Sequence, residues 1–237
     1  MEETMTLKVI ATIENDFTTK FGIPRQSGLA KEQRSRIVFA PEYRDNNALR
    51  GLEGYSHLWL IWGFSKVEKK TWSPMVKPPR LGGNKRMGVF ATRSPYRPNP
   101  IGLSSVELIA LEKVPGKGTV LVVAGADLMD GTPIYDIKPY LSFTDSHPEA
   151  RNGFAQEHLG DTLQVDFPEA LLSRIPEEKR PGLIAALSQD PRPAYQNDPE
   201  QPYGFAFSGL DVRFKVRDGV LRVFEIADTP GPEGTKN

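Results

Sequence analysis

The stretch SHLWLIWGF, residues 56–64, is the segment from which the fold is predicted. Its centre is apolar at consecutive positions, as in a strand that is buried on both faces or in a buried helix. Two tryptophans within seven apolar-rich residues favour the strand. His57 stands at the mouth of this run, where a lone histidine is more often a structural residue than a catalytic one.

Shorter segments on both sides of this stretch also have the composition of strands. In residues 7–13, Leu7, Val9, Ala11 and Ile13 fall on one face. Further strands are predicted at residues 35–40, 88–92, 103–114, 119–126 and 134–140, and the turn PGKG (115–118) joins two of them. Many short strands, repeated turn signals and no long helix predict a mainly β, antiparallel barrel or sandwich over residues 1–145.

The segment 134–140 places two charged residues on one side of its strand. With a period of two, Asp136 and Lys138 share one face, while Tyr135 and Ile137 share the other. If Ile137 packs in the core, the two charged side chains point together away from it.

The composition changes near Ser146, so residues 146–237 are predicted to form a second, small α+β domain. Asp166-Phe167-Pro168-Glu169 resembles a capping box that begins a helix, and a second helix is predicted at 182–188. Asp218-Gly219 predicts a two-residue hairpin that pairs Val216 with Leu221 and Phe214 with Val223. That register places basic residues together on the opposite face, namely Arg213, Lys215, Arg217 and Arg222.

A proline-rich loop at residues 93–100, RSPYRPNP, interrupts the predicted strands. Each proline fixes φ and biases the preceding residue toward extended backbone, so the loop is stiff. A stiff loop presents Arg93, Tyr96, Arg97 and Asn99 with little entropy left to lose on binding. The loop taken alone is equally consistent with a rigid connector.

The charge around this loop favours binding. Residues 69–106 contain no Asp or Glu and eight basic residues, in a chain with 30 of each sign. Concentrated positive charge with Trp72, Phe90 and Tyr96 nearby suits a polyanion with exposed bases, although a solvated basic face is the alternative. The residues alone predict an RNA-binding protein and no particular reaction.

Composition excludes several classes of protein and of site. The chain has no cysteine, which excludes disulfides and thiolate chemistry, and His57, His147 and His158 do not have metal-ligand spacing, so no metal is expected. The start MEETMTLK lacks an apolar signal core and no apolar run is long enough to span a bilayer, so a cytoplasmic protein is expected, without membrane contact. Neither GxGxxG after a strand nor a P-loop occurs.

Five segments carry a resemblance to a known family: PRQSGL (24–29), GLEGYSHLWLIW (51–62), RLGGNKRMGVFATRSPYRPNPIGLS (80–104), DLMDGTPIYDIKPY (127–140) and DPRPAY (190–195). They resemble the bacterial tRNA methyltransferases that methylate N6 of threonylcarbamoyladenosine beside the anticodon. The resemblance implies an S-adenosylmethionine-dependent enzyme on a small antiparallel β-barrel, acting as a homodimer with the cofactor near the subunit interface.

The same motifs imply a cofactor site at Arg25, Gln26, Ser27, Gly28, Leu29, His57, Leu58, Arg93, Leu103, Leu128, Met129, Asp130 and Gly131. Backbone groups at turns can bind adenine, leucines can sandwich it, and Asp130 can meet an ammonium or a ribose hydroxyl. Ser27 stands where relatives can carry proline, which matters little if the contact is through the main chain.

For catalysis, Asp136 is the candidate to accept the N6 proton, with Lys138 and Tyr140 orienting the base; an ordinary strand with an ion pair is equally consistent. Lys77, Lys85, Arg86 and Arg97 are expected to meet tRNA phosphates. Arg192, between two prolines, is predicted to bind the threonyl carboxylate, with Tyr195 also contacting substrate. Arg192 could instead join the two domains by pairing with Asp190 or Glu200. Two other functions stay open: a non-catalytic RNA-binding barrel, and a metabolite methyltransferase, against which the basic tract argues.

Overall fold

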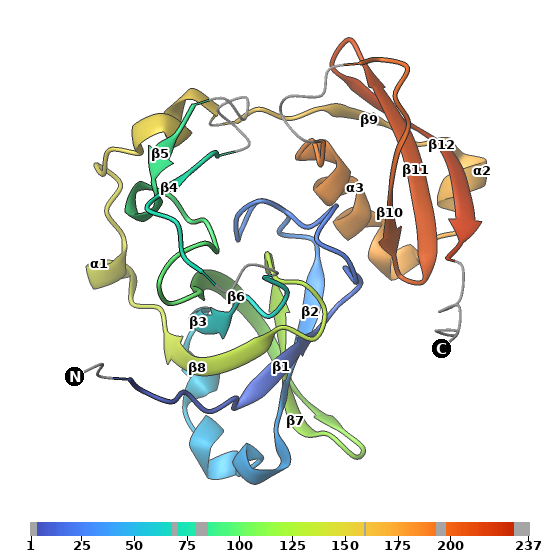
Figure 1. The fold of residues 1–237 in the computed structure, drawn as a ribbon. Coiled ribbons are helices and arrows are strands. Elements are labelled where there is room, and N and C mark those ends of the chain that lie inside the picture. The colour runs from blue at the N-terminus through green and yellow to red at the C-terminus, as the bar shows by residue number, and fades with distance from the viewer. Residues whose placement is uncertain (1–3, 68–70, 79–84, 159, 193–197, 230–237) are drawn as a thin grey trace, which may run out of the picture.

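The computed structural model describes residues 4–67, 71–78, 85–158, 160–192 and 198–229, and its first unit is a closed antiparallel barrel (Figure 1). The strand order around the barrel is β1-β2-β7-β6-β3-β8, which confirms the predicted architecture. Its strands are β1 (Ala11–Glu14), β2 (Arg34–Phe39), β3 (His57–Gly63), β6 (Ile101–Val114), β7 (Gly118–Ala124) and β8 (Pro133–Pro139).

Strand β3 corresponds to the stretch that predicts the fold, and it lies between β6 and β8. Leu58 and Leu60 are fully buried and Trp62 is nearly so, within the barrel core. The indole of Trp62 lies over Gly102 of β6, where a Cβ atom would come within 2.2 Å of Trp62 Cε2. Glycine at this position therefore leaves the space that the indole fills.

Two of the predicted strands are shorter than expected. Strand β1 begins at Ala11, where its pairing with β2 ends at Phe39, and Leu7 and Val9 are exposed instead of buried. The segment 88–92 is not one strand: β5 (Met87–Gly88) pairs with β4 (Met75–Val76), and Val89–Ala91 then forms a 3-10 turn, η5. Both corrections reflect the length of the partner strand, which local composition does not encode.

Strand β8 contains an irregularity that breaks the predicted alternation. Asp136 lies opposite Ile61, but Ile134 lies opposite Trp62, so Tyr135 is an extra residue. Ile134 is fully buried and Ile137 packs against the same core. The predicted shared face of Tyr135 and Ile137 is therefore wrong, whereas Asp136 and Lys138 do lie together.

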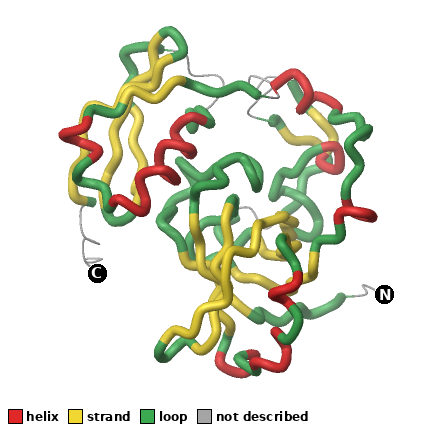
Figure 2. Tube along the Cα trace, turned by 180° about the vertical axis from the view of Figure 1, so that it is seen from behind, coloured by secondary structure: helices red, strands yellow, loops and turns green. Residues whose placement is uncertain are grey.

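The second unit is a four-stranded sheet of order β10-β11-β12-β9, with β9 parallel to β12. Figure 2 shows this unit beside the barrel, next to the end marked C. Its elements are β9 (Gln164–Asp166), α2 (Glu169–Leu172), α3 (Arg180–Ser188), β10 (Tyr203–Phe207), β11 (Leu210–Arg217) and β12 (Val220–Asp228). Leu183 and Leu187 of α3 pack on the sheet in a separate core. Phe17, from the N-terminal part of the chain, is buried in this second core.

The predicted hairpin is confirmed in its register. Asp218 and Gly219 have φ of 50° and 77°, the left-handed geometry that a two-residue turn requires. The predicted basic sheet face, however, is neutralised by ion pairs: Arg213 with Asp211 and Glu225, Lys215 and Arg217 with Glu200, and Arg222 with Asp166. These acids come from the strands themselves and from adjacent segments, so the face does not act as an isolated cationic surface.

Both predicted helices exist, but the capping box does not. The residue before α2 is Pro168, which makes no side-chain cap, and Asp166 instead ends β9 and pairs with Arg222. The remaining helical elements are α1 (Ser142–Asp145), η1 (Pro41–Tyr43), η2 (Asn46–Leu49), η3 (Leu52–Gly54), η6 (Gly153–His158) and η7 (Glu177–Lys179). Among the described residues, no helix is both long and apolar enough to cross a membrane.

Candidate functional site

The loop at residues 24–29 is fixed against the segment that follows β7. The backbone N–H of Gly28 donates to the carbonyl of Gly125 at 2.8 Å. A Cβ on Gly125, which has φ of 72°, would lie 3.2 Å from the Cα of Gly28, so the two chains approach closely. This contact places residues 25–29 next to the segment that leads into the turn at 128–131.

Arg93 joins the proline-rich loop to this site. Its Nη1 donates to Oε1 of Gln26, so two sequence segments that the resemblance groups together do meet. Within its own loop, Arg97 donates to the carbonyl of Thr92 at 3.2 Å, and the carbonyl of Tyr96 accepts from the N–H of Ser73. The loop is therefore held by hydrogen bonds as well as by its prolines.

The turn at residues 128–131 is held by hydrogen bonds from residues 13–17, at the end of β1 and directly after it. Asn15 donates from its backbone N–H to Asp130 Oδ1 at 3.0 Å and from its side chain to the carbonyl of Leu128 at 2.8 Å. The N–H groups of Asp130 and Gly131 donate to the carbonyls of Phe17 and Ile13. Four bonds thus fix the turn that the family resemblance predicts to contact the cofactor.

The four leucines predicted at the cofactor site have different exposures. Leu58 and Leu128 are buried in the barrel core, so their side chains cannot sandwich a ligand. Leu29 and Leu103 are 39% and 55% exposed and can do so. A contribution from Leu58 or Leu128 is limited to the backbone.

A buried polar chain that the sequence did not suggest lies beside this site. Trp62 Nε1 donates to Ser104 Oγ at 2.9 Å, and Ser104 donates to Asp127 Oδ1 at 2.5 Å. Burial raises the pKa of Asp127, while the Ser104 hydroxyl, the charge of Arg93 and the N–H of Ser27 oppose that shift. The sequence feature that could have indicated this chain is Ser104, a polar residue at an inward-facing position of strand β6.

A second group of predicted residues lies on the outer face of the barrel. The ring of Tyr140 is 5.4 Å from that of Trp59 and 6.1 Å from that of His57. Lys138 Nζ forms an ion pair with Asp136 Oδ2 at 2.9 Å, and Asp136 Oδ1 accepts from the N–H of Ile137. The three predicted catalytic residues therefore share a face, with both oxygens of Asp136 engaged.

A groove of about 370 Å³ runs along this outer face. Trp59 donates at its edge to Asp145 Oδ2 at 2.8 Å. The hydrogen bond from the N–H of Leu141, followed by this bond from Trp59, lowers the pKa of Asp145. The lining residues are Trp59, Ile61, Leu103, Lys138, Thr144, Asp145 and His147.

Two of the predicted cofactor residues, His57 and Leu103, lie apart from each other in the barrel wall. Leu103 pairs with Ile61, whereas His57 pairs with Glu107, four positions further along β6. At strand spacing, this separates the two backbone positions by about 13 Å. His57 is exposed, and its Nδ1 lies 3.0 Å from Ser56 Oγ.

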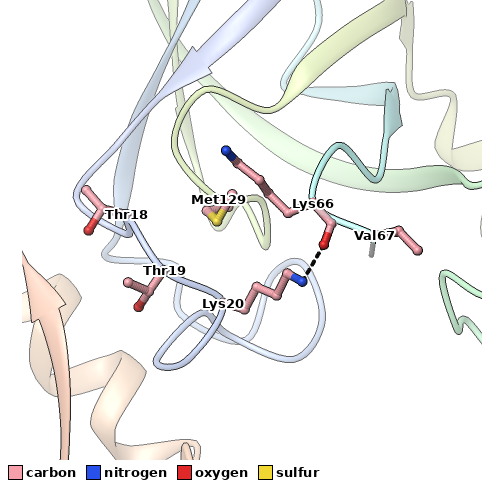
Figure 3. A pocket seen from close by; sticks show the side chains of 6 residues that line it. All are labelled: Thr18, Thr19, Lys20, Lys66, Val67 and Met129. Carbon is pink, nitrogen blue, oxygen red and sulfur yellow. Dashed lines mark hydrogen bonds between the residues drawn. The ribbon is translucent and has the colours of Figure 1, made fainter. Parts of the chain in front are cut away.

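A further open hollow, of about 450 Å³, borders the turn at Met129 (Figure 3). Lys20 reaches across it and donates to the backbone carbonyl of Lys66. Its walls are formed by Thr18, Thr19, Lys20, Lys66, Val67 and Met129. None of the first five was selected from the sequence.

The structure describes all of the residues that are predicted to bind substrate except Tyr195. Arg192 binds Asp190 through Nε at 2.9 Å, and Arg25 donates to the carbonyls of Asp190 and Arg192 at 2.7 and 2.6 Å. Lys77, Lys85 and Arg86 are exposed. Tyr195 lies outside the described residues. Within the described ranges, no His, Asp and Glu side chains gather into a group that could hold a metal ion.

Known proteins share both units of this chain. Residues 12–146 match the model of the tRNA-methyltransferase O N-terminal domain, and residues 160–229 match that of the TrmO C-terminal domain. The tRNA (adenine(37)-N6)-methyltransferase of Escherichia coli is 42% identical over 226 residues, which cover 92% of this chain and 95% of that protein. A putative S-adenosylmethionine-dependent methyltransferase, RcsF, of Pseudomonas aeruginosa is 39% identical over 94% of this chain and 98% of its own length.

The fold is shared as well. The crystal structure of TrmO from Pseudomonas aeruginosa superposes with a TM-score of 0.76 at 34% identity, covering 95% of this chain and all of that one. With both domain models matched in order and a relative aligned over nearly its full length, the chain belongs to the tRNA-methyltransferase O family.

Proposed function

We propose that this protein transfers a methyl group from S-adenosylmethionine to N6 of threonylcarbamoyladenosine next to the anticodon of tRNA. Family membership over both domains is the observation that carries the proposal. In it, residues 1–145 form the cofactor-binding methyltransferase domain, and residues 146–237 form a domain that contacts tRNA. The tRNA substrate implies a cytoplasmic enzyme.

The side chains at the barrel end suit this cofactor chemically. Arg93 can bind its carboxylate, and Asp130, with Oδ2 left over from the bond to Asn15, can bind its ammonium or a ribose hydroxyl. Leu29 and Leu103 offer exposed apolar surface for adenine. When bound, the cofactor supplies an electrophilic methyl group on a cationic sulfur.

The protein contributes positioning and electrostatics to this displacement. The attacking N6 must lose a proton, and Asp136 is the proposed acceptor, with Lys138 and Tyr140 orienting the base. In the ion pair, Lys138 occupies Oδ2 of Asp136. Both side chains are about half exposed, so substrate can displace the lysine without breaking a buried contact.

Recognition of tRNA is assigned to two groups of residues. Lys85, Arg86 and Arg97 are proposed to meet phosphates. Arg192 is proposed to bind the threonyl carboxylate, with Tyr195 contributing to the same subsite. The pair with Asp190 uses only two of the five N–H groups of the Arg192 guanidinium, so Asp190 can orient Arg192 while its other donors bind substrate.

A homodimer is part of the proposal. The outer face of β6 exposes Ile101 and Leu103 and, beyond Ser105 and Glu107, also Ile109, and exposed apolar side chains of this kind suit a protein interface. Within one chain, His57 of β3 and Leu103 of β6 lie apart along the paired strands. A partner subunit could supply the second of these residues to a shared cofactor site. Sedimentation that finds a fully active monomer would contradict the shared site.

Transfer of tritiated methyl groups to tRNA tests the whole proposal. We expect label in threonylcarbamoylated tRNA and much less in tRNA that lacks this group. Binding of tRNA without any methyl transfer would identify a non-catalytic RNA-binding barrel instead. Transfer to small metabolites but not to tRNA would equally overturn the assignment.

A further inference from the structure

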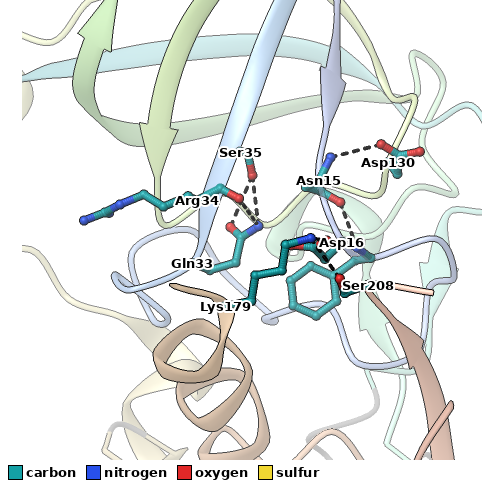
Figure 4. A network of polar contacts seen from close by, with 9 residues as sticks. Asn15, Asp16, Gln33, Arg34, Ser35, Asp130, Lys179 and Ser208 are labelled. Carbon is teal, nitrogen blue, oxygen red and sulfur yellow. Dashed lines mark hydrogen bonds and ion pairs between the residues drawn. The ribbon is translucent and has the colours of Figure 1, made fainter. Parts of the chain in front are cut away.

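Residues Asn15, Asp16 and Phe17, here called the strap, connect the turn at residues 128–131, here called the cofactor turn, to the C-terminal domain. They follow directly on β1 and lie between the two units. Figure 4 shows Asn15 beside Asp130 and Asp16 beside Lys179. Asn15 bonds to the turn, Asp16 bonds to the C-terminal domain, and Phe17 contacts both. Neither the resemblance nor the predicted site residues include them.

The strap holds the barrel side through Asn15. Its backbone N–H and its side-chain amide bind the two ends of the turn, at Asp130 Oδ1 and at the carbonyl of Leu128. Its side-chain oxygen accepts from the N–H of Phe17 at 2.9 Å, and the Phe17 carbonyl accepts from the N–H of Asp130 at 2.8 Å. The strap and the turn therefore form one closed set of hydrogen bonds.

The C-terminal side is held by burial and by an ion pair. Phe17 is fully buried, and its ring lies 5.4 Å from that of Phe207, with which it also forms a β-bridge. Lys179 Nζ binds Asp16 Oδ1 at 2.7 Å and Ser208 Oγ at 2.8 Å. This pair is largely shielded, with side chains 33% and 20% exposed.

We propose that the C-terminal domain preorganises the cofactor turn through the strap, with Lys179, Asp16 and Asn15 as positioning residues. Phe17 cannot move with the second core without displacing Asn15, because only one residue separates them. A turn held in its binding geometry loses less entropy when ligand arrives. The inference rests on the proposed use of residues 128–131 for S-adenosylmethionine.

Calorimetry with S-adenosylmethionine tests the strap, using Lys179→Met. We expect affinity to fall by about fivefold or more, the size of a modest coupling between sites. The matched control is Lys215→Met, which removes a lysine paired with Glu200 at 3.1 Å in the same sheet domain but away from the strap. That control should bind like the unmutated protein.

A double-mutant cycle with Asn15→Ala separates positioning from simple destabilisation. If Lys179 acts through the strap, the two losses of affinity are not additive, whereas independent effects would add. Asp16→Asn, checked for folding by circular dichroism, gives the same test should Lys179→Met fail to fold. Unchanged affinity in a folded strap variant overturns the inference, and no binding by the unmutated protein overturns the proposed function instead.

Discussion

Asp190 holds Arg192 with both of its carboxylate oxygens, Nε bonding to Oδ1 and Nη2 to Oδ2, each at 2.9 Å. The Arg192 side chain is only 12% exposed. A lysine could reach one of these oxygens but could not make the planar double contact. This double contact fixes the plane of the guanidinium.

Arg192→Lys should reduce the preference for threonylcarbamoylated over unmodified tRNA at every salt concentration, because an ammonium cannot bind a carboxylate bidentately. Kinetics with the two tRNAs measure it. Arg174→Lys, at an exposed arginine beside Asp228, is the control. A folded Arg192→Lys enzyme with full preference would leave Arg192 as a structural residue paired with Asp190.

Arg93→Ala should weaken S-adenosylmethionine binding by about tenfold or more, since a hydrogen bond to a charged group contributes about 1.5–3 kcal/mol. It also removes the bond to Gln26 that joins the two loops. Calorimetry measures the affinity. Arg36→Ala, at an exposed arginine 3.9 Å from Glu112, should bind normally. Equal affinities in the two variants would exclude Arg93 from the site.

The double variant Lys85→Ala, Arg86→Ala should weaken tRNA binding and flatten its salt dependence by about one to two units, because each phosphate contact releases counterions. It should not alter the preference for the modified base. Binding measured over a range of salt tests this. Lys8→Ala, Lys113→Ala removes two exposed lysines outside the basic tract and should leave the slope unchanged. A slope equal to that of the unmutated protein in the Lys85, Arg86 variant would argue against phosphate contacts there.

The pH dependence of stability should report on Asp127. Burial raises its pKa in the folded state, so its contribution to stability is present below the unfolded pKa and is lost as pH rises through the folded value. Asp127→Asn lacks this titration. The unmutated protein should therefore gain stability relative to Asp127→Asn as pH falls, measured by urea unfolding at neutral and acidic pH.

Asp145 provides the opposite sign as a control. The N–H groups of Leu141 and Trp59 lower its pKa, so its stabilising contribution is present above the unfolded pKa and is lost on acidification. The unmutated protein should lose stability relative to Asp145→Asn as pH falls. If the unmutated protein lost stability relative to both variants on acidification, the buried hydrogen-bonded chain of Trp62, Ser104 and Asp127 would not govern the titration of Asp127.

Gly102→Ala should destabilise the barrel by about 1–3 kcal/mol, the usual cost of overpacking a core. The added Cβ would meet the indole of Trp62 at 2.2 Å. Denaturant unfolding measures the change. Gly88→Ala, whose Cβ would have no neighbour within 4 Å, should be close to neutral. A Gly102→Ala protein as stable as the Gly88→Ala protein would show that Trp62 can shift at little cost.

The sequence by itself determined the elements whose signals are local. Consecutive apolar residues at 57–63 specify β3, and Asp218-Gly219 specifies a hairpin with its register, since the left-handed turn geometry is a property of those two residues. Prolines stiffen the loop that carries Arg93 without help from the rest of the fold. The segments that carry the family resemblance, such as DLMDGTPIYDIKPY (127–140), are likewise contiguous, so they can be read from the sequence alone.

Only the tertiary structure decided which of these residues meet. Ser104 and Asp127 are 23 positions apart, and Arg25 and the carbonyl of Arg192 are 167 apart, so no local pattern links them. The extra residue in β8, the acids that neutralise the C-terminal sheet and the burial of Phe17 in the second core depend on partners supplied by distant segments. Those contacts form only when the barrel closes and the second sheet packs beside it, because hydrogen bonding and burial act through space and not along the chain.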